Sequence, residues 1–515
     1  MVDAPRQGRG LKEVNALLIE PYNSRRPEER SAHNGALGPL YLAAALRDAG
    51  YHADYLDATI GTPDQSLEDT FYNRRADNDG YGLVTYGMTA SQVADATEPY
   101  SLVGISNIFA PQSPNTVDII REVRKKDPEK FIIAGGVNPR SLPDMFLDAG
   151  ANAVCAGEGE GLVVDVANAL SAGKPWQEIG GLIYRTDGRN KFTGPREIIH
   201  NADDFPIPAY ALLDLAKYWE ISIPHGGTFK PGEEIRHGPA EFARGCMFRC
   251  SFCHVGLEKP GGPFGHLSEW RAKSIQRALS EAQILKDLGV QWIFMEGDSE
   301  LADPRRAAKL MRELRGLDLK LADVNGVNLV SLFRKESNKW ELNYDLLDAM
   351  AEAGMKELVL PFESGSKRII DRWATGKWDP ENMNVALLVR EAKRRKMVVP
   401  GNFMFGFPDE TPEEVGKTLG LAERLVDQGL DGASLFIVTP YPGSPLWDYA
   451  IRNNLMDPNI NLKQLSWANP VMDTVIPKEE LIRIRFEERP RINGRQGPYF
   501  EEMKKSISVG PGRDD

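Results

Sequence analysis

The stretch RGCMFRCSFCHVG, residues 244–256, decides how the second half of this chain is interpreted. It holds three of the four cysteines in the chain, at the spacing C-x3-C-x2-C: Cys246, Cys250 and Cys253. Thiolates are soft ligands that suit zinc or the iron of an iron–sulfur cluster. Three thiols within eight residues therefore predict a metal centre.

Whether a fourth protein ligand is present distinguishes a zinc site from an iron–sulfur cluster. A structural zinc ion takes four ligands, but His254 directly follows the last thiol and Cys155 is distant on a predicted strand. Three thiolates without a fourth ligand suit a four-iron–four-sulfur (4Fe-4S) cluster with one open iron, which can bind a substrate or cofactor. Three buried structural cysteines, or a zinc site completed from elsewhere in the chain, remain as alternatives.

The totals limit the class of protein. A chain of 515 residues suggests two or three domains. Its net charge of -12 argues against a nucleic-acid partner, because phosphate binding needs a basic surface. The polar N-terminus predicts no signal peptide, and no apolar run is long enough for a membrane span. Four cysteines form no disulfide framework, so we expect a cytoplasmic protein.

Residues 1–165 alternate strand-like and helix-like segments. The strands are expected at 14–21, 52–58, 101–107, 131–136 and 152–160, and the helices at 38–51, 116–128 and 141–150. This alternation predicts an α/β fold with a doubly wound, Rossmann-like parallel sheet. Ligands of such sheets bind beyond the carboxyl ends of the strands.

The alternation resumes after a connector at 166–235, which contains a short hairpin and a proline-rich segment. In residues 236–450 we expect six β/α units, which form a partial TIM-like (β/α)6 barrel. The strands are expected at 241–245, 290–298, 319–326, 357–364, 398–406 and 432–440. Residues 451–515 form a C-terminal extension with five arginines in a basic run: Arg483, Arg485, Arg489, Arg491 and Arg495.

The barrel region resembles the radical S-adenosylmethionine (SAM) enzymes. The resemblance rests on the cysteine motif with its aromatic residue and on four further segments in the family's order: FMEGD (294–298), ESGS (363–366), GFPDET (406–411) and PYPGSPL (440–446). It implies that the three cysteines hold a 4Fe-4S cluster whose open iron binds SAM. It also implies a set of SAM-binding residues: Phe252, Glu296, Asp298, Glu363 and Ser364. For the three acids, the alternative is a strand-end carboxylate that caps the next helix.

The first domain resembles the cobalamin-binding domain of one large class of these enzymes. The matching segments are 37–43, 103–106, 134–136 and 157–160. The resemblance implies a set of cobalamin-binding residues: Gly38, Pro39, Ser106, Asn107, Phe109, Gly135, Gly136, Gly157 and Glu158. The glycines alone would also fit ordinary turns of a parallel sheet. The chain departs from the D-x-H-x-x-G motif of some cobalamin proteins, because Thr59 stands where the histidine would be, so no lower imidazole ligand of cobalt is expected.

The combined resemblance implies a cobalamin-dependent radical SAM methyltransferase of natural-product biosynthesis. Such an enzyme transfers a methyl group from methylcobalamin to an unactivated carbon or phosphorus of a small molecule, using a 5′-deoxyadenosyl radical. An external electron donor of the flavodoxin or ferredoxin type is its expected partner. A cobalamin-dependent cyclase or rearrangement enzyme, and a non-catalytic cobalamin and iron–sulfur sensor, are the alternatives. The basic run at 483–495 fits an anionic substrate or, more simply, a solvated helix face.

Overall fold

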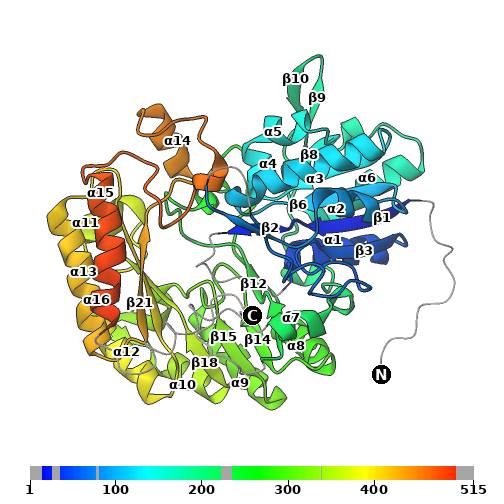
Figure 1. The fold of residues 1–515 in the computed structure, drawn as a ribbon. Helices are drawn as coiled ribbons and strands as arrows, with labels where there is room; N and C mark the ends of the chain where they lie inside the picture. The colour runs from blue at the N-terminus through cyan, green and yellow to red at the C-terminus, as the bar shows by residue number, and fades with distance from the viewer. Residues whose placement is uncertain (1–13, 26–34, 77–80, 222–234, 338, 495–515) are drawn as a thin grey trace, which may run out of the picture. The chain divides into compact units, whose positions relative to one another are not determined.

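The computed structural model describes residues 14–25, 35–76, 81–221, 235–337 and 339–494. They form two compact units, of which the first ends at Asp214 and the second begins at Leu215. Figure 1 shows the elements of both units, which are described one at a time. No helix of these residues is long and apolar enough to cross a membrane.

A seven-stranded sheet forms the centre of the first unit. In spatial order its strands are β3 (His52–Asp57), β1 (Asn15–Glu20), β6 (Leu102–Ser106), β7 (Phe131–Gly135), β8 (Ala153–Cys155), β9 (Leu182–Thr186) and β10 (Arg189–Phe192). The strands from β3 to β8 are parallel. Because β1 pairs with β3 on one side and with β6 on the other, the winding reverses at β1, and the predicted doubly wound fold is confirmed. Such a reversal opens a ligand crevice beyond the carboxyl ends of these strands.

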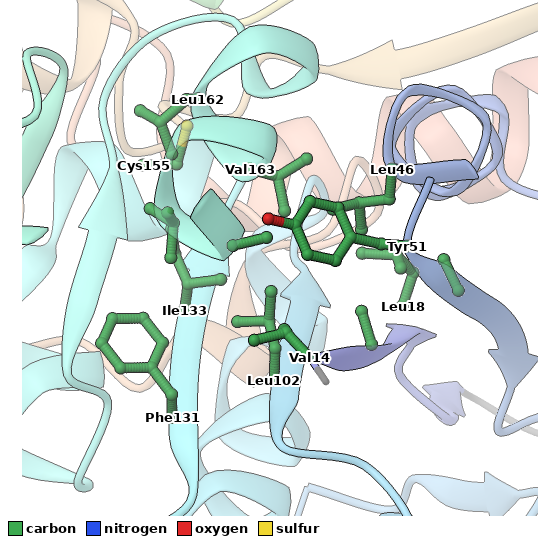
Figure 2. Packing of buried hydrophobic residues seen from close by; sticks show 14 of the residues in the cluster. Val14, Leu18, Leu46, Tyr51, Leu102, Phe131, Ile133, Cys155, Leu162 and Val163 are labelled. Carbon is green, nitrogen blue, oxygen red and sulfur yellow. The ribbon is translucent and has the colours of Figure 1, made fainter. Parts of the chain in front are cut away.

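Helices cover both faces of this sheet. They are α1 (Leu37–Asp48), α2 (Ala90–Ala96), α3 (Ser113–Lys126), α4 (Val137–Ser141), α5 (Pro143–Asp148) and α6 (Gly159–Ser171). Helix α1 contacts α6, and α2 contacts α3. The core between the sheet and the α1–α6 pair includes Leu18, Ile133, Leu46 and Leu162. Figure 2 shows these side chains, from strands and helices, meeting in one apolar cluster.

The first unit extends beyond the segment that resembles a cobalamin domain. Residues 166–214, which the sequence analysis assigned to a connector, lie within the first unit. The reason is strand pairing: Leu182 of β9 pairs with Cys155 of β8, and β10 folds back on β9. A hairpin that reads as a local feature in the sequence thus adds two strands to the sheet.

The second unit contains seven parallel strands at six positions, because β18 and β19 are one residue apart and share a position, as expected for a partial barrel. The strands are β11 (His237–Ala240), β14 (Trp292–Met295), β15 (Lys320–Asp323), β18 (Met355–Leu358), β19 (Leu360–Glu363), β20 (Pro400–Phe405) and β21 (Gly432–Ile437). They form two sheets, β11-β14-β15-β18 and β19-β20-β21. One residue separates β18 from β19, and Leu358 donates a backbone hydrogen bond to Val398, so this segment passes from one sheet to the other.

The barrel helices follow the expected strand–helix order. They are α8 (Ile275–Asp287), α9 (Pro304–Leu314), α10 (Tyr344–Glu352), α11 (Lys367–Trp373), α12 (Val385–Arg394) and α13 (Pro412–Asp427). The expectation for the first strand, 241–245, was wrong: β11 lies just before it, and Ala243–Arg244 forms the short β12, antiparallel to β13 (Arg271–Ala272). The sequence HGPA of β11 lacks a strand pattern, and its pairing with β14 decides the position.

The C-terminal segment completes the barrel edge. Helix α14 (Pro445–Arg452) crosses the boundary expected at 450, and α15 (Lys478–Arg483), a π-helical turn (Ile484–Glu488) and α16 (Arg489–Asn493) follow one another. The amide of Asn493 accepts a hydrogen bond from the Ala433 N–H at 2.7 Å and donates one to the Ala433 carbonyl at 2.9 Å. A side chain therefore satisfies backbone groups of β21 that no neighbouring strand pairs.

Candidate cofactor and active site

The three thiols lie in the loop after β12. Cys250 is buried, Cys246 and Cys253 are partly buried, and all three are free. Burial raises the pKa of the Cys250 thiol to about 11 and also raises that of Cys253, and the charges of the three thiols affect one another. They therefore lie close together in a poorly solvated loop, where thiolates are unfavourable until a metal binds them.

The arrangement fits a cluster better than a single ion. Among the described residues, no three His, Cys, Asp or Glu side chains are placed to hold one metal ion. A four-iron cluster does not need that convergence, because each thiolate binds a different iron. His254 instead contacts Glu258, at 2.9 Å between Nδ1 and Oε1.

Two segments that are distant in the sequence hydrogen-bond to the cysteine loop. The backbone N–H of Ser251 donates to the Trp373 carbonyl at 2.7 Å, and the thiol of Cys250 donates to the Ala374 carbonyl at 3.5 Å. On the other side, the N–H of Leu446 donates to the Ser251 carbonyl at 2.7 Å. The PYPGSPL segment thus acts as a support for the cysteine loop.

Phe252 points into the apolar cluster beside this support. Its ring centroid lies 6.0 Å from that of Phe407, in a cluster with residues of α11 and α14. The structure gives the aromatic residue of the cysteine motif a packing role that anchors the loop.

Glu363 is the strand-end acid with the most unusual geometry. It ends β19 in the left-handed region, with φ of +58°, which non-glycine residues rarely adopt. Its Oε1 lies 3.0 Å from Nζ of Lys377, and both side chains are nearly buried. Such strain at a buried charged residue is typical of a functional site.

Lys377 links this acid to the cysteine loop. Burial lowers the pKa of its ammonium, but the negative charges of Glu363, Cys250 and Cys246 outweigh burial, so the pKa is raised. The structure therefore places a nearly buried cation in contact with the strand-end carboxylate and within electrostatic reach of the thiols. Sequence reasoning missed Lys377, because it lies in the loop after α11 and matches no motif.

The other predicted SAM-binding residues differ in their surroundings. The Asp298 side chain is exposed. Desolvation by the surrounding protein nevertheless raises its carboxyl pKa, and the charge of His254 opposes that rise; the charge of Asp298 also reaches the thiol of Cys253. Glu296 is partly buried just after β14, and its carbonyl accepts a hydrogen bond from Asn325 at 2.6 Å. The structure thus brings Asp298 next to the cysteine loop.

Ser364 and the rest of the ESGS segment pack against α13. The Ser364 hydroxyl lies 3.1 Å from that of Thr418 and accepts a hydrogen bond from the Ser366 N–H. A Cβ at Gly365 would lie 2.6 Å from the Lys417 carbonyl oxygen. The serine side chain and the glycine therefore fix the turn that holds Glu363.

Three buried acids at strand ends were not predicted as site residues. Asp323 ends β15, and burial raises its pKa to about 7, while the N–H of Gly326 and the charge of Lys377 oppose the rise. Glu300 accepts from the N–H groups of Phe242 and Gly297, and Glu410 accepts from those of Gly406 and Phe407. Glu300 and Glu410 thus stabilise loops by accepting backbone hydrogen bonds, whereas Asp323 lies close enough to Lys377 for the two charges to interact. No signal in the sequence identified Asp323, because the strand was expected to run on to residue 326 and only the structure ends it at Asp323.

In the first unit, the predicted cobalamin-binding residues divide into exposed and structural positions. Gly38 and Phe109 are exposed, Ser106 is partly buried, and Pro39 is buried. Asn107 is fully buried: its side chain accepts from Ser113 at 2.8 Å and donates to Thr116 at 3.0 Å. Asn107 therefore positions the loop that exposes Phe109.

The glycine positions of this unit also have packing roles. A Cβ at Gly136, which has φ of +104°, would lie 2.5 Å from the Asn107 carbonyl oxygen, whereas one at Gly135 or Gly157 would make only ordinary contacts. Glu158 precedes α6 and accepts a hydrogen bond from the Ile199 N–H at 2.9 Å. Gly136 thus lets the loops after β6 and β7 approach closely.

The carboxyl ends of β1 and β6 carry a residue that the sequence analysis did not identify. Ser106 hydrogen-bonds the carboxyl group of Glu20, whose pKa is raised to about 8 by burial and by the nearby charge of Asp57. At the position of the missing histidine, the N–H of Thr59 donates to Asp57 Oδ1 at 2.8 Å, and the threonine is buried. Carboxyl and hydroxyl groups therefore gather at the carboxyl ends of β1, β3 and β6.

Comparisons with known proteins agree with both units. The model of the radical SAM superfamily matches residues 240–422, and that of the B12 binding domain matches residues 33–167. An uncharacterized methyltransferase of Pyrococcus horikoshii is 31% identical over 347 residues, which cover 66% of this chain and 67% of that protein. The cytidylyl-2-hydroxyethylphosphonate methyltransferase of Streptomyces wedmorensis is 25% identical, and the matched region covers 95% of this chain and 92% of that protein.

A solved structure shares the fold. The radical SAM methyltransferase TsrM from Kitasatospora setae, with tryptophan substrate and a SAM analogue bound, matches with a TM-score of 0.60 at 17% identity, over 85% of this chain and 76% of its own. Cobalamin, SAM and a 4Fe-4S cluster are the cofactors that the two matched domains imply. From its two domains and its relatives, the chain belongs to the cobalamin-dependent radical SAM methyltransferases.

Proposed function

We propose that this enzyme methylates an unactivated carbon or phosphorus atom of a small natural-product precursor. The observation that carries the proposal is the joint placement, in one unit, of three neighbouring free thiols and the buried Glu363–Lys377 pair. Methyl transfer is the activity of the family. The similarity to the cytidylyl-2-hydroxyethylphosphonate methyltransferase, which extends over almost the whole chain, supports a small anionic acceptor.

In this proposal the residues of the second unit divide the work. Cys246, Cys250 and Cys253 hold the cluster, while Glu363 and Asp298 offer carboxylates to the SAM ammonium. When bound, the cofactors supply an electron, a hydrogen-abstracting radical and a methyl group. The apolar packing around Phe252 keeps water from the cysteine loop, which protects a reactive radical from side reactions.

For the first unit we propose that cobalamin binds beyond the carboxyl ends of β1 and β6, at the winding reversal. The open positions there, Gly38, Ser106 and Phe109, are the proposed contacts, and Asn107 and Gly136 shape the loops that carry them. No imidazole is proposed below the cobalt, because Thr59 is buried and bonded to Asp57.

The electron source and the compartment follow from the same chemistry. A cluster that cleaves SAM needs one electron per cycle, for which we propose a flavodoxin or ferredoxin type of donor. Free thiols that await iron need a reducing environment, so we propose that the enzyme acts in the cytoplasm.

The deciding experiment uses the full chain, reconstituted anaerobically with iron, sulfide and cobalamin and supplied with dithionite and methyl-labelled SAM. Methyl transfer predicts both 5′-deoxyadenosine and S-adenosylhomocysteine, with label in the acceptor; cytidylyl-2-hydroxyethylphosphonate is the first acceptor to test. Deoxyadenosine without S-adenosylhomocysteine would instead indicate a cyclase or rearrangement enzyme. Neither product from a fully loaded protein would indicate a sensor and refute the proposal.

A matched pair of cysteine variants provides the control. Cys250→Ala removes a proposed cluster ligand, and we expect it to abolish deoxyadenosine formation together with the iron–sulfur absorption band. Cys155→Ala removes a thiol that is buried in the core of the first unit and hydrogen-bonds the Gly157 carbonyl at 3.4 Å, and we expect full activity.

A further inference from the structure

The basic run near the C-terminus contains two kinds of arginine. Arg483 and Arg491 are exposed and paired with acids: Arg483 contacts Glu480 at 2.7 Å, and Arg491 contacts Glu488 at 2.7 Å. For these two, the simpler interpretation of a solvated helix face is correct. Arg495 lies outside the described residues.

Arg485 and Arg489 are less exposed than these two. Arg485 is only 8% exposed, and its guanidinium lies 5.8 Å from the centroid of the Phe436 ring. Arg489 is partly buried; its Nε is fully buried without a hydrogen-bond partner, and within residues 14–494 as described no carboxylate pairs with it. A largely buried guanidinium without a counter-charge is costly unless an anion reaches it.

Arg485 lies within a π-helical turn that contacts β21, and Arg489 directly follows that turn. They stand four residues apart, at the spacing that places side chains on one side of a helix, and the π-helical turn (Ile484–Glu488) runs up to Arg489. Such turns occur often at functional sites. Since Arg485 faces Phe436 of β21, Arg489 follows on the same side.

That side of β21 is shared with the cysteine loop. Phe436 pairs in register with Met404 of β20, and paired residues of parallel strands lie on the same face of the sheet. Met404 packs in the same apolar cluster as Phe252 of the cysteine loop. Trp467 lies next to Phe436: the centroids of their two rings are 5.7 Å apart, and Trp467 is 47% exposed.

We propose that Arg485 and Arg489 form a binding site for an anionic group of the methyl acceptor. The planar guanidinium fork matches the oxygens of a phosphoryl or carboxylate group, and the exposed Trp467 offers a stacking surface for a flat group beside it. This inference rests on the proposed function, because it assigns the anchor of the acceptor rather than the chemistry.

The test measures anion binding, which does not depend on the cluster. Methylphosphonate binding to the full chain is followed by ³¹P NMR line broadening for the wild type and for Arg489→Gln, with Arg483→Gln as the matched surface control. We expect binding that weakens about tenfold or more in Arg489→Gln, as loss of a charge-assisted contact implies, and that is unchanged in Arg483→Gln. Acetate competition distinguishes the source: poor competition indicates a phosphoryl group, and equal competition a carboxylate.

Two outcomes would overturn the proposal: no measurable binding of either anion, or equal binding by wild type and Arg489→Gln. Arg489→Lys guards against misfolding, since it keeps the charge but loses the planar fork, and it should show an intermediate loss. Deoxyadenosine formation with dithionite is measured in parallel. If it persists while anion binding is absent, the anion site is wrong and the proposed function stands.

Discussion

Replacing Lys377 with methionine removes the cation that pairs with Glu363 and lies within electrostatic reach of the cysteine loop. The two charged groups are 3.0 Å apart, and their side chains are 13% and 7% exposed, so solvent screens them little. At the effective dielectric constant of about 20 that suits protein sites, this separation corresponds to an attraction of about 5 kcal/mol. Removing one partner of a buried pair typically costs about 3–5 kcal/mol, because the other charge stays buried and unpaired.

We therefore expect Lys377→Met to lower the free energy of unfolding of the second unit by about 3–5 kcal/mol. Glu363→Gln alone leaves the ammonium unpaired and should also destabilise. The double variant should lose much less than the sum of the two, because neither remaining group needs a counter-charge. The coupling energy of this cycle should be about 3 kcal/mol.

Urea unfolding of the metal-free protein, followed by tryptophan fluorescence, gives the four free energies. The exposed pair Lys367–Asp371, 2.7 Å apart with side chains 38% and 51% exposed, is the matched control, and its coupling should be about 0.5 kcal/mol. Equal coupling in both cycles, or additive effects of the Glu363 and Lys377 variants, would refute the interpretation of the pair as a desolvated ion pair.

Three further outcomes can be checked with the same methods. Asp323 has a native pKa of about 7, raised from 3.8 by burial, so the native state binds its proton more tightly than the unfolded state. As the pH rises from about 4 to about 7, the free energy of unfolding of the wild type should fall by at most about 4 kcal/mol, because the unfolded state loses this proton first. Asp323→Asn should lack this fall, and parallel pH profiles of the two proteins would contradict the prediction. Gly365→Ala forces a Cβ against the backbone of α13 and should cost about 1–3 kcal/mol, whereas Gly416→Ala, which meets nothing within 4 Å, should be neutral or stabilising in urea. Iron content after reconstitution should fall in Cys250→Ala and stay unchanged in Cys155→Ala, and an equal loss in both would disprove the cysteine assignment.

The strand–helix order was predictable because apolar runs and helix periodicity are local properties of the sequence. The parallel strands of the first unit and five of the six barrel strands lie where these patterns indicate. The exceptions are segments whose structure depends on distant partners. HGPA becomes β11 by pairing with β14, and β9 joins the first sheet by pairing with β8.

The candidate site divides in the same way. The cysteines and the ESGS acid could be identified from spacing and from the resemblance to a family. Asp323 and Lys377 could not, because their importance comes from desolvation and from neighbours far away in the sequence. Asn107, which stays a predicted cobalamin contact, is also buried and hydrogen-bonded to Ser113 and Thr116, a role that its position in the sequence does not show.

The sequence by itself determined the chemistry that this chain can hold, because thiol spacing and strand-end motifs are written in consecutive residues. Tertiary structure decided which charges face one another and which are desolvated. It placed Lys377 beside Glu363 and within reach of the thiols, and it buried Arg485 and part of Arg489 while Arg483 and Arg491 stay exposed and pair with acids. The physical reason is that pKa values, ion pairs and desolvation depend on distance and burial in space, which the order of residues along the chain does not specify.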